Sequence, residues 1–192
     1  QYLVPRMDKL IIGGGMANTF LLAQGINIGK SLAEADLVEI AKAILGKAKE
    51  SGCEILLPVD AVVANTLSAD ATCKTVHVDN VAEDQMILDV GSDSIELFNN
   101  HIVECQTLLW NGPLGAFEFN PFGKGTFAVA KQAAKLTKAG KLLTVAGGGD
   151  TVAALNVAEV TASFSYVSTA GGAFLEWLEG KELPGVSVLF ES

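Results

Sequence analysis

The sequence predicts an α/β protein with a doubly wound, mainly parallel sheet and helices on both faces, a Rossmann-like three-layer sandwich. The main observation is that a strand, a loop of small residues and a helix follow one another about five times, an alternation typical of parallel sheets. The composition agrees, since 49% of the 192 residues are hydrophobic, 18% are charged and 20 are glycines. This length suits one α/β domain or one large piece of a bigger protein.

The first unit is an apolar strand at 9–12, which runs into Gly13-Gly14-Gly15 and a helix at 16–22. Apolar residues on one helical face then predict a helix at 33–48, which Ser51-Gly52 closes. The other predicted elements are strands at 54–57, 75–78, 86–91, 107–110, 141–145 and 163–167, an extended run at 58–68, and helices at 92–103, 127–136 and 173–178. The two extended segments between 58 and 78 suit either a hairpin or an edge excursion. Loops after parallel strands gather at one edge, so we expect the glycine-rich loops to line a common cleft.

Composition also limits the function. A net charge of -9 argues against a nucleic-acid partner, because such binding needs clustered Lys and Arg. No apolar run has the roughly 20 residues of a membrane helix, and the N-terminus has no signal-peptide pattern. The three cysteines form no Cys-x-x-Cys pair, which favours a reduced, cytoplasmic compartment without a zinc site. The two histidines are too isolated to indicate a metal cluster or a catalytic triad.

The segment 142–151 is an apolar strand that ends in Gly147-Gly148-Gly149, followed by Asp150 and Thr151. A loop without side chains lets a ligand reach backbone N–H groups, and the first turn of the next helix favours an anion. A carboxylate beside a phosphate calls for a hard cation between them, so the loop predicts a phosphate site with Mg²⁺. The alternative is a glycine-rich turn with Asp150 as a helix N-cap.

The segment 110–118 reads Trp-Asn-Gly-Pro-Leu-Gly-Ala-Phe-Glu. Asn111 ends a strand, and the turn at Gly112-Pro113 fixes the backbone behind it. An amide can donate to a phosphate oxygen and the Glu118 carboxylate can accept from ribose hydroxyls, so the two could hold opposite parts of one nucleotide. The alternative is a turn in which the asparagine satisfies its own backbone.

Two familiar nucleotide motifs are incomplete. The stretch Gly29-Lys30-Ser31 would need a glycine at position 24 to form a phosphate-binding loop, but Gln24 stands there. Both glycine triplets lack the last glycine of the dinucleotide-binding fingerprint. A Rossmann-type oxidoreductase is therefore disfavoured.

Four motifs together resemble the phosphoglycerate kinase family, in that family's order and across nearly the whole chain. They are Ile11-Ile12-Gly13-Gly14-Gly15-Met16-Ala17, Trp110-Asn111-Gly112-Pro113 with Phe117-Glu118, Gly147-Gly148-Gly149-Asp150-Thr151, and Ser168-Thr169-Ala170-Gly171-Gly172-Ala173 with Leu175-Glu176 and Leu183-Pro184-Gly185. The resemblance is to the C-terminal, nucleotide-binding half of that two-domain kinase. It implies that residues 1–192 form this domain without its first strand and without the N-terminal substrate domain.

The resemblance also implies roles for individual residues. Gly14, Gly15 and Leu32 would form the adenine pocket, and Gly91 would let the base approach from the other side. Glu118 would bind the ribose, Asn111 a phosphate, and Pro113 would shape the pocket wall. Gly148, Gly149, Asp150 and Thr151 would hold the terminal phosphates of Mg-ADP or Mg-ATP, with Asp150 as the Mg²⁺ ligand. Gly171 and Gly172 would stabilise the phosphoryl group in transfer.

The family's reaction is reversible transfer between 1,3-bisphosphoglycerate and Mg-ADP, which gives 3-phosphoglycerate and Mg-ATP. The chain departs from the family in having Ala170 where a glycine is usual. It also starts downstream of the family's Gly-Gly-Ala-Lys loop and lacks the basic N-terminal domain, so the isolated chain is expected to be essentially inactive. The alternative is a stand-alone nucleotide-binding or partner-binding module without catalysis. We expect a monomer with small-molecule partners, and neither nucleic acid nor a membrane.

Overall fold

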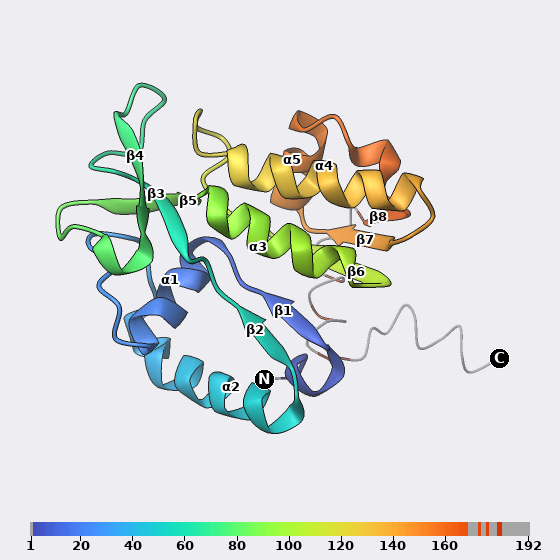
Figure 1. The fold of residues 1–192 in the computed structure, drawn as a ribbon, viewed down its shortest axis with the longest axis horizontal. Coiled ribbons are helices and arrows are strands. Elements are labelled where there is room, and N and C mark those ends of the chain that lie inside the picture. Colours follow the sequence, from blue (N-terminus) through green and yellow to red (C-terminus); the bar gives the residue numbers. More distant parts are fainter. Residues whose placement is uncertain (1, 169–172, 174–175, 177–179, 182–192) are drawn as a thin grey trace.

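The computed structural model describes residues 2–168, 173, 176 and 180–181, and Figure 1 shows their arrangement. The first parallel pair consists of β1 (Lys9–Ile11) and β2 (Glu54–Leu56), with Lys9 opposite Glu54. A short 3-10 turn, η1 (Val4–Arg6), precedes β1. The helices α1 (Gly14–Ala23) and α2 (Val38–Ser51) connect the two strands, with η2 (Ala35–Leu37) before α2. Gly52 ends α2 in the left-handed conformation with φ 75°, as the sequence predicts for a helix stop.

The middle of the chain forms an antiparallel excursion. Strands β3 (Asp60–Ala64), β4 (Cys73–His77) and β5 (Met86–Val90) form a three-stranded sheet in the order β4-β3-β5, with β3 antiparallel to both neighbours. The turn η3 (Val78–Asn80) follows β4. Of the two possibilities that the sequence left open, β3 and β4 therefore form a hairpin, and β4 is an edge strand.

The second parallel sheet contains β6 (Thr107–Asn111), β7 (Leu143–Gly147) and β8 (Tyr166–Ser168), in that order. Its connecting helices are α3 (Ser92–Val103) before β6, then α4 (Lys124–Lys138) and α5 (Gly149–Val157). Strand β7 starts two residues later than predicted and β8 three. The 3-10 turn η4 (Thr161–Ser163) takes up the start of the predicted last strand. The predicted helix at 173–178 lies largely outside the described residues.

The largest apolar core joins the helices to this second parallel sheet. Phe98 of α3, Trp110 of β6 and Leu155 of α5 are buried in it, together with alanines of α4. Trp110 and Phe164 lie with ring centroids 6.3 Å apart. Figure 1 shows α3 and α4 running beside one another over β6 and β7. The expected α/β class, with parallel sheets flanked by helices, is confirmed; the parallel strands fall into two hydrogen-bonded groups rather than one continuous sheet.

A polar cluster joins β1, β2 and α3 near the start of β1. The Lys9 ammonium donates to the Glu104 carboxylate, lies 2.9 Å from His101 Nδ1 and lies 3.9 Å from Glu54 Oε2. The hydrogen bond with Glu104 raises the pKa of Lys9.

In the part of the chain that the structure describes, no helix has the length and apolar character needed to cross a membrane.

Candidate functional site

The four helices that follow strands β1, β5, β6 and β7 all begin after a glycine. The N-cap residues are Gly13 for α1, Gly91 for α3, Gly123 for α4 and Gly148 for α5, and none supplies a side-chain cap. The first N–H groups of a helix need acceptors from elsewhere, because no carbonyl precedes them within the helix. The four helices differ in which groups accept hydrogen bonds from these first N–H groups.

The first turn of α3 is occupied by a carboxylate from β3. Asp60 Oδ1 accepts from Ser94 N–H at 2.8 Å and from the Ser94 hydroxyl at 2.6 Å, and Asp60 Oδ2 accepts from Asp93 N–H at 3.1 Å. A Cβ atom built on Gly91 would lie less than 3.0 Å from three atoms of the Asp60 carboxyl group. The structure therefore gives Gly91 a steric reason to lack a side chain.

The first turn of α4 is occupied in the same way by Asp89 of β5. Asp89 Oδ2 accepts from Gly125 N–H and Oδ1 accepts from Val90 N–H, both at 2.9 Å. Only 1% of Asp89 is exposed. Burial raises the pKa of Asp89 to about 7, against the opposing effect of the backbone N–H groups of Gly125, Val90 and Lys124.

At the N-terminus of α5, no carboxylate from another element accepts from the first N–H groups among the described residues. The first two residues of this helix, Gly149 and Asp150, are exposed. Strand register pairs Asn111 of β6 with Gly147 of β7. A Cβ built on Gly148, which has φ +96°, would lie 2.9 Å from Asn111 Oδ1. Two of the loops that the sequence predicted to share a cleft, those after β6 and β7, therefore meet at the start of α5. The loop predicted at 169–172 lies outside the described residues.

Thr151 connects these two loops. Its hydroxyl oxygen accepts from Gly112 N–H at 2.7 Å, and only 2% of the residue is exposed. This contact fixes the turn after Asn111 to the first turn of α5. The hydroxyl proton of Thr151 remains available as a donor, because Thr151 is the acceptor in this hydrogen bond.

A cavity of about 380 Å³, called the main cavity below, is lined by residues of the 113–118 segment, which follows Asn111 and Gly112 along the chain. Five of the predicted site residues line it: Gly14, Gly15, Leu32, Pro113 and Glu118. Gly14 N–H donates to the Leu114 carbonyl at 3.1 Å, which joins the start of α1 to the 113–118 segment. The 111–114 segment thus runs from the open end of α5 to the wall of the main cavity.

Leu32 lines this cavity and is 80% exposed. Its backbone is held from α1, because the Asn18 amide donates to the Leu32 carbonyl at 3.0 Å. Thr19 of the same helix accepts from Glu34 N–H at 3.0 Å. These two contacts attach the 32–34 segment to the helix that follows the first glycine triplet.

Sequence reasoning missed several lining residues, among them Asn18, Leu67, Ile87, Asp89 and Ala116. Asn18 carried a signal, because it is a polar residue within the apolar helix 16–22 and is almost fully buried. Asp89 carried a similar one, as a carboxylate inside an apolar strand. Leu67 and Ala116 carried none.

The predicted residues outside this arrangement are few. Gly91 does not line the main cavity, although its neighbour Val90 does. Gly171 and Gly172 lie outside the described residues.

A Mg²⁺ ion would find one carboxylate at the start of α5. Asp150 is exposed there, and the described residues contain no group of three His, Cys, Asp or Glu that could hold a metal on its own. Mg²⁺ keeps several waters and is often bound through one or two carboxylates plus substrate phosphates. The donor set therefore fits Mg²⁺ that arrives with a nucleotide.

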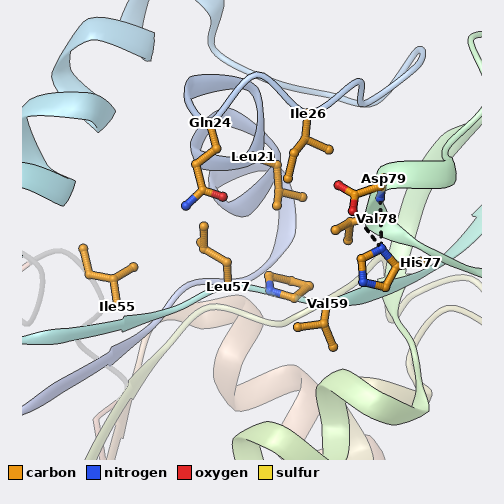
Figure 2. A pocket seen from close by; sticks show the side chains of 10 residues that line it. Leu21, Gln24, Ile26, Ile55, Leu57, Val59, His77, Val78 and Asp79 are labelled. Carbon is orange, nitrogen blue, oxygen red and sulfur yellow. Dashed lines mark hydrogen bonds and ion pairs between the residues drawn. The ribbon is translucent and has the colours of Figure 1, made fainter.

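A second hollow, the side hollow, has a volume of about 260 Å³ and opens between α1 and the end of β4 (Figure 2). Its polar end is His77, whose Nδ1 lies 3.2 Å from Asp79 Oδ2. Leu21, Pro58 and Val78 line both spaces. Neither glycine triplet is among the residues that line the side hollow.

Glycine-rich loops at the carboxyl ends of parallel strands, an open helix N-terminus and a cavity lined by two of these loops define the nucleotide-binding class of α/β proteins. Comparison with known proteins narrows this class. The profile of the family described as "Phosphoglycerate kinase" matches residues 1–181. The chain belongs to the phosphoglycerate kinase family, which confirms the family that the motifs indicated.

Similar proteins include curated phosphoglycerate kinases from Methylorubrum extorquens (strain PA1), 65% identical over 189 residues, and Rhizobium meliloti (strain 1021), 62% identical over 189 residues. Each alignment covers 98% of this chain and 47% of the relative. The chain thus spans about half the length of the curated relatives it matches.

Two solved structures share the fold. Phosphoglycerate kinase from Coxiella burnetii matches 99% of this chain and 48% of its own, with 44% identity and a TM-score of 0.94. The enzyme from Pyrococcus horikoshii OT3 matches 98% of this chain and 47% of its own, with 27% identity and a TM-score of 0.82.

Proposed function

We propose that this chain is the nucleotide-binding, C-terminal half of a phosphoglycerate kinase. The complete enzyme would transfer a phosphoryl group reversibly between 1,3-bisphosphoglycerate and Mg-ADP, giving 3-phosphoglycerate and Mg-ATP. The observation that carries the proposal is that the 111–114 segment contacts the open N-terminus of α5 through Gly112 and lines the main cavity through Pro113 and Leu114. A base with ribose suits the cavity, and phosphates suit the helix end.

The base would lie against Gly14 and Gly15, where absent side chains expose flat backbone, with Leu32 beside it in the cavity. Pro113 would form the opposite wall. The Glu118 carboxylate, exposed at the same cavity, would accept hydrogen bonds from ribose hydroxyls. Gly91 does not line the cavity, so it would affect the base only through the backbone that it shares with Val90, which does.

The phosphates would lie at the start of α5. The N–H groups of Gly148 and Gly149, the Thr151 hydroxyl and the Asn111 amide are the donors gathered there. Asp150 would hold Mg²⁺, which when bound neutralises charge on the phosphate oxygens. The Thr151 contact with Gly112 would keep these donors in register with the base cavity. Gly171 and Gly172, predicted to act on the transferred group, stay predictions.

The division of the parallel strands supports the proposal that another segment completes the domain. In the described part of the chain, β1 pairs with β2 alone and β6 pairs with β7 alone, so each leaves one edge unpaired. A first strand could pair with such an edge, and an N-terminal domain would bring the acyl phosphate or 3-phosphoglycerate. Phosphoryl transfer depends on positioning and charge neutralisation, so the chain alone would have almost no turnover.

The partners under this proposal are small molecules: ADP or ATP and the phosphoglycerates. A net charge of -9 gives little basis for nucleic-acid binding. We infer that the protein is a monomer. We also infer that it works in the cytoplasm, because Cys53, Cys73 and Cys105 are all free and thiols stay reduced there.

The activity is tested with the full-length gene product in a coupled assay for ATP formed from 1,3-bisphosphoglycerate and ADP. Turnover that requires Mg²⁺ is expected. Absence of ATP formation by a folded protein would contradict the kinase proposal; if that protein still bound Mg-ADP, the function would be that of a binding module.

The Mg²⁺ role is tested by Asp150→Ala, which should weaken ADP binding far more with Mg²⁺ than without it. The matched control is Asp93→Ala, because Asp93 is an exposed carboxylate in the first turn of α3, whose end Asp60 occupies. Equal losses with and without Mg²⁺ in Asp150→Ala would mean that Asp150 only stabilises the helix.

A further inference from the structure

Asp89 lies where the end of β5, the 113–118 segment and the start of α4 meet. It is the penultimate residue of β5, it lines the cavity, and its carboxylate accepts from Gly125 N–H in the first turn of α4. Among the described residues, no lysine or arginine forms an ion pair with it. Backbone N–H groups alone satisfy this buried carboxyl group, which is an expensive arrangement for a purely structural residue.

The 113–118 segment packs directly against this carboxyl group. A Cβ on Gly115 would lie less than 3.0 Å from Asp89 Oδ1 and 2.6 Å from the Phe122 carbonyl oxygen. The Leu88 carbonyl, one residue before Asp89, accepts from Ala116 N–H at 2.8 Å. The middle of the segment is therefore fitted to the end of β5 around the Asp89 side chain.

The start of α4 provides the third support. Thr126, next to the Gly125 that Asp89 holds, accepts from Leu114 N–H at 2.9 Å. A Cβ on Gly125 would lie 2.6 Å from Asp89 Oδ1, so the helix approaches the carboxyl group as closely as a glycine allows. Pro113 and Glu118, at the two ends of the segment, both line the cavity.

We propose that Asp89 is a positioning residue of the nucleotide site: its carboxyl group holds α4 and the 113–118 segment against β5, and so fixes the wall that Pro113 and Glu118 present to a nucleotide. The proposal rests on the nucleotide site proposed above. It deepens that function by connecting the shape of the wall to a single buried acid.

Because Asp89 lines the cavity, a bound nucleotide changes the surroundings of its carboxyl group and hence its pKa. Burial raises the pKa of Asp89 to about 7, while attraction to Lys124 of α4 lowers it; Glu118 is the other described carboxylate among the residues that line the cavity. Although the Asp89 carboxyl group is itself almost fully buried, a nucleotide that fills the cavity replaces the water beyond it with less polar atoms and so raises its pKa further. Binding near neutral pH is therefore coupled to proton uptake, and affinity falls as pH rises through and above 7.

The test is calorimetric titration of the full-length gene product with Mg-ADP between pH 6 and 9, in two buffers of different ionisation enthalpy. Wild type should take up a fraction of a proton, and Asp89→Asn should take up less. If binding raises the Asp89 pKa by about one, wild-type affinity should fall about tenfold relative to the variant across this range. The comparison with the variant removes the titration of the nucleotide itself.

Asp60→Asn is the matched control. Asp60 is also a buried carboxylate that occupies a helix end, but it does not line the main cavity. The Asp60→Asn variant should take up the same fraction of a proton on binding Mg-ADP as wild type. If Asp89→Asn fails to fold, ¹³C NMR of the wild-type Asp89 carboxyl carbon with and without Mg-ADP gives the same answer, because its pKa should rise on binding.

The outcomes separate the two proposals. No binding of Mg-ADP by folded wild type would overturn the nucleotide site and this role together. Binding by wild type with equal proton uptake in wild type and Asp89→Asn would overturn the role of Asp89 alone. An unchanged Asp89 pKa on binding would do the same.

Discussion

Replacing Gly91 with alanine separates a packing role from a role in nucleotide binding. The new methyl group would lie less than 3.0 Å from Oδ1, Oδ2 and Cγ of Asp60, and these atoms are held by Ser94 and Asp93. Overpacking of this kind costs about 1–3 kcal/mol. Displacing the carboxylate from the first turn of α3 adds about 0.5–2 kcal/mol.

We therefore expect Gly91→Ala to lower the free energy of unfolding by about 3 kcal/mol, or the melting temperature by about 6–12 °C. The assay is urea unfolding of the chain followed by circular dichroism. Gly46→Ala is the control, because Gly46 lies inside α2 with open space around its Cβ direction. That change should stabilise the chain by about 0.5–1 kcal/mol.

A double variant identifies the cause. With Asp60→Ala in the background, the three closest atoms are gone, so Gly91→Ala should cost less than half as much. If Gly91→Ala were as stable as wild type, or if its cost did not depend on Asp60, the steric reasoning would be refuted. A loss of Mg-ADP affinity without a loss of stability would instead favour a direct contact of Gly91 with the nucleotide.

Three further predictions concern other residues. Because the pKa of Asp89 is raised to about 7, its contribution to stability should fall by about 4 kcal/mol as pH rises from 4 to above 7; urea unfolding should show this as the difference between the pH profiles of wild type and Asp89→Asn. Gly29→Ala should destabilise by about 3 kcal/mol or more in the same assay, since φ is +57° and the Cβ would meet the carbonyl oxygens of Gln85 and Ala82. Asn18→Ala should weaken Mg-ADP binding about threefold to tenfold by releasing the 32–34 segment, which calorimetry would detect; an unchanged affinity would exclude that support.

Local patterns were enough to predict much of the fold. The glycine triplet after 9–12 correctly marked the passage from β1 to α1, because a strand that runs into glycines and then into helix formers has few alternatives. The antiparallel excursion was left open, because short extended runs do not specify their partners. The start of β8 was misplaced, because Thr161–Ser163 forms a 3-10 turn that apolar content alone does not indicate.

For the candidate site too, the sequence predicted some features and missed others. Sequence reasoning predicted a site at the loops around Gly14, Asn111 and Gly148, and the structure connects these loops through the contacts of Gly14 with Leu114 and of Gly112 with Thr151. It did not find which helix N-termini are occupied by a carboxylate, because Asp60 lies 33 and 34 residues from the α3 N–H groups that donate to it and Asp89 lies 36 residues from Gly125. Contacts over such separations depend on strand order, which the local sequence does not specify.

The most direct test of the nucleotide site is photolabelling of the full-length gene product with 2-azido-ADP and Mg²⁺, followed by peptide mass spectrometry. The base should attach at Leu32 or within 113–118, at the main cavity, and excess Mg-ADP should suppress the adduct. An adduct at His77 or Asp79 in the side hollow, or labelling at the main cavity that excess Mg-ADP leaves unchanged, would contradict the account.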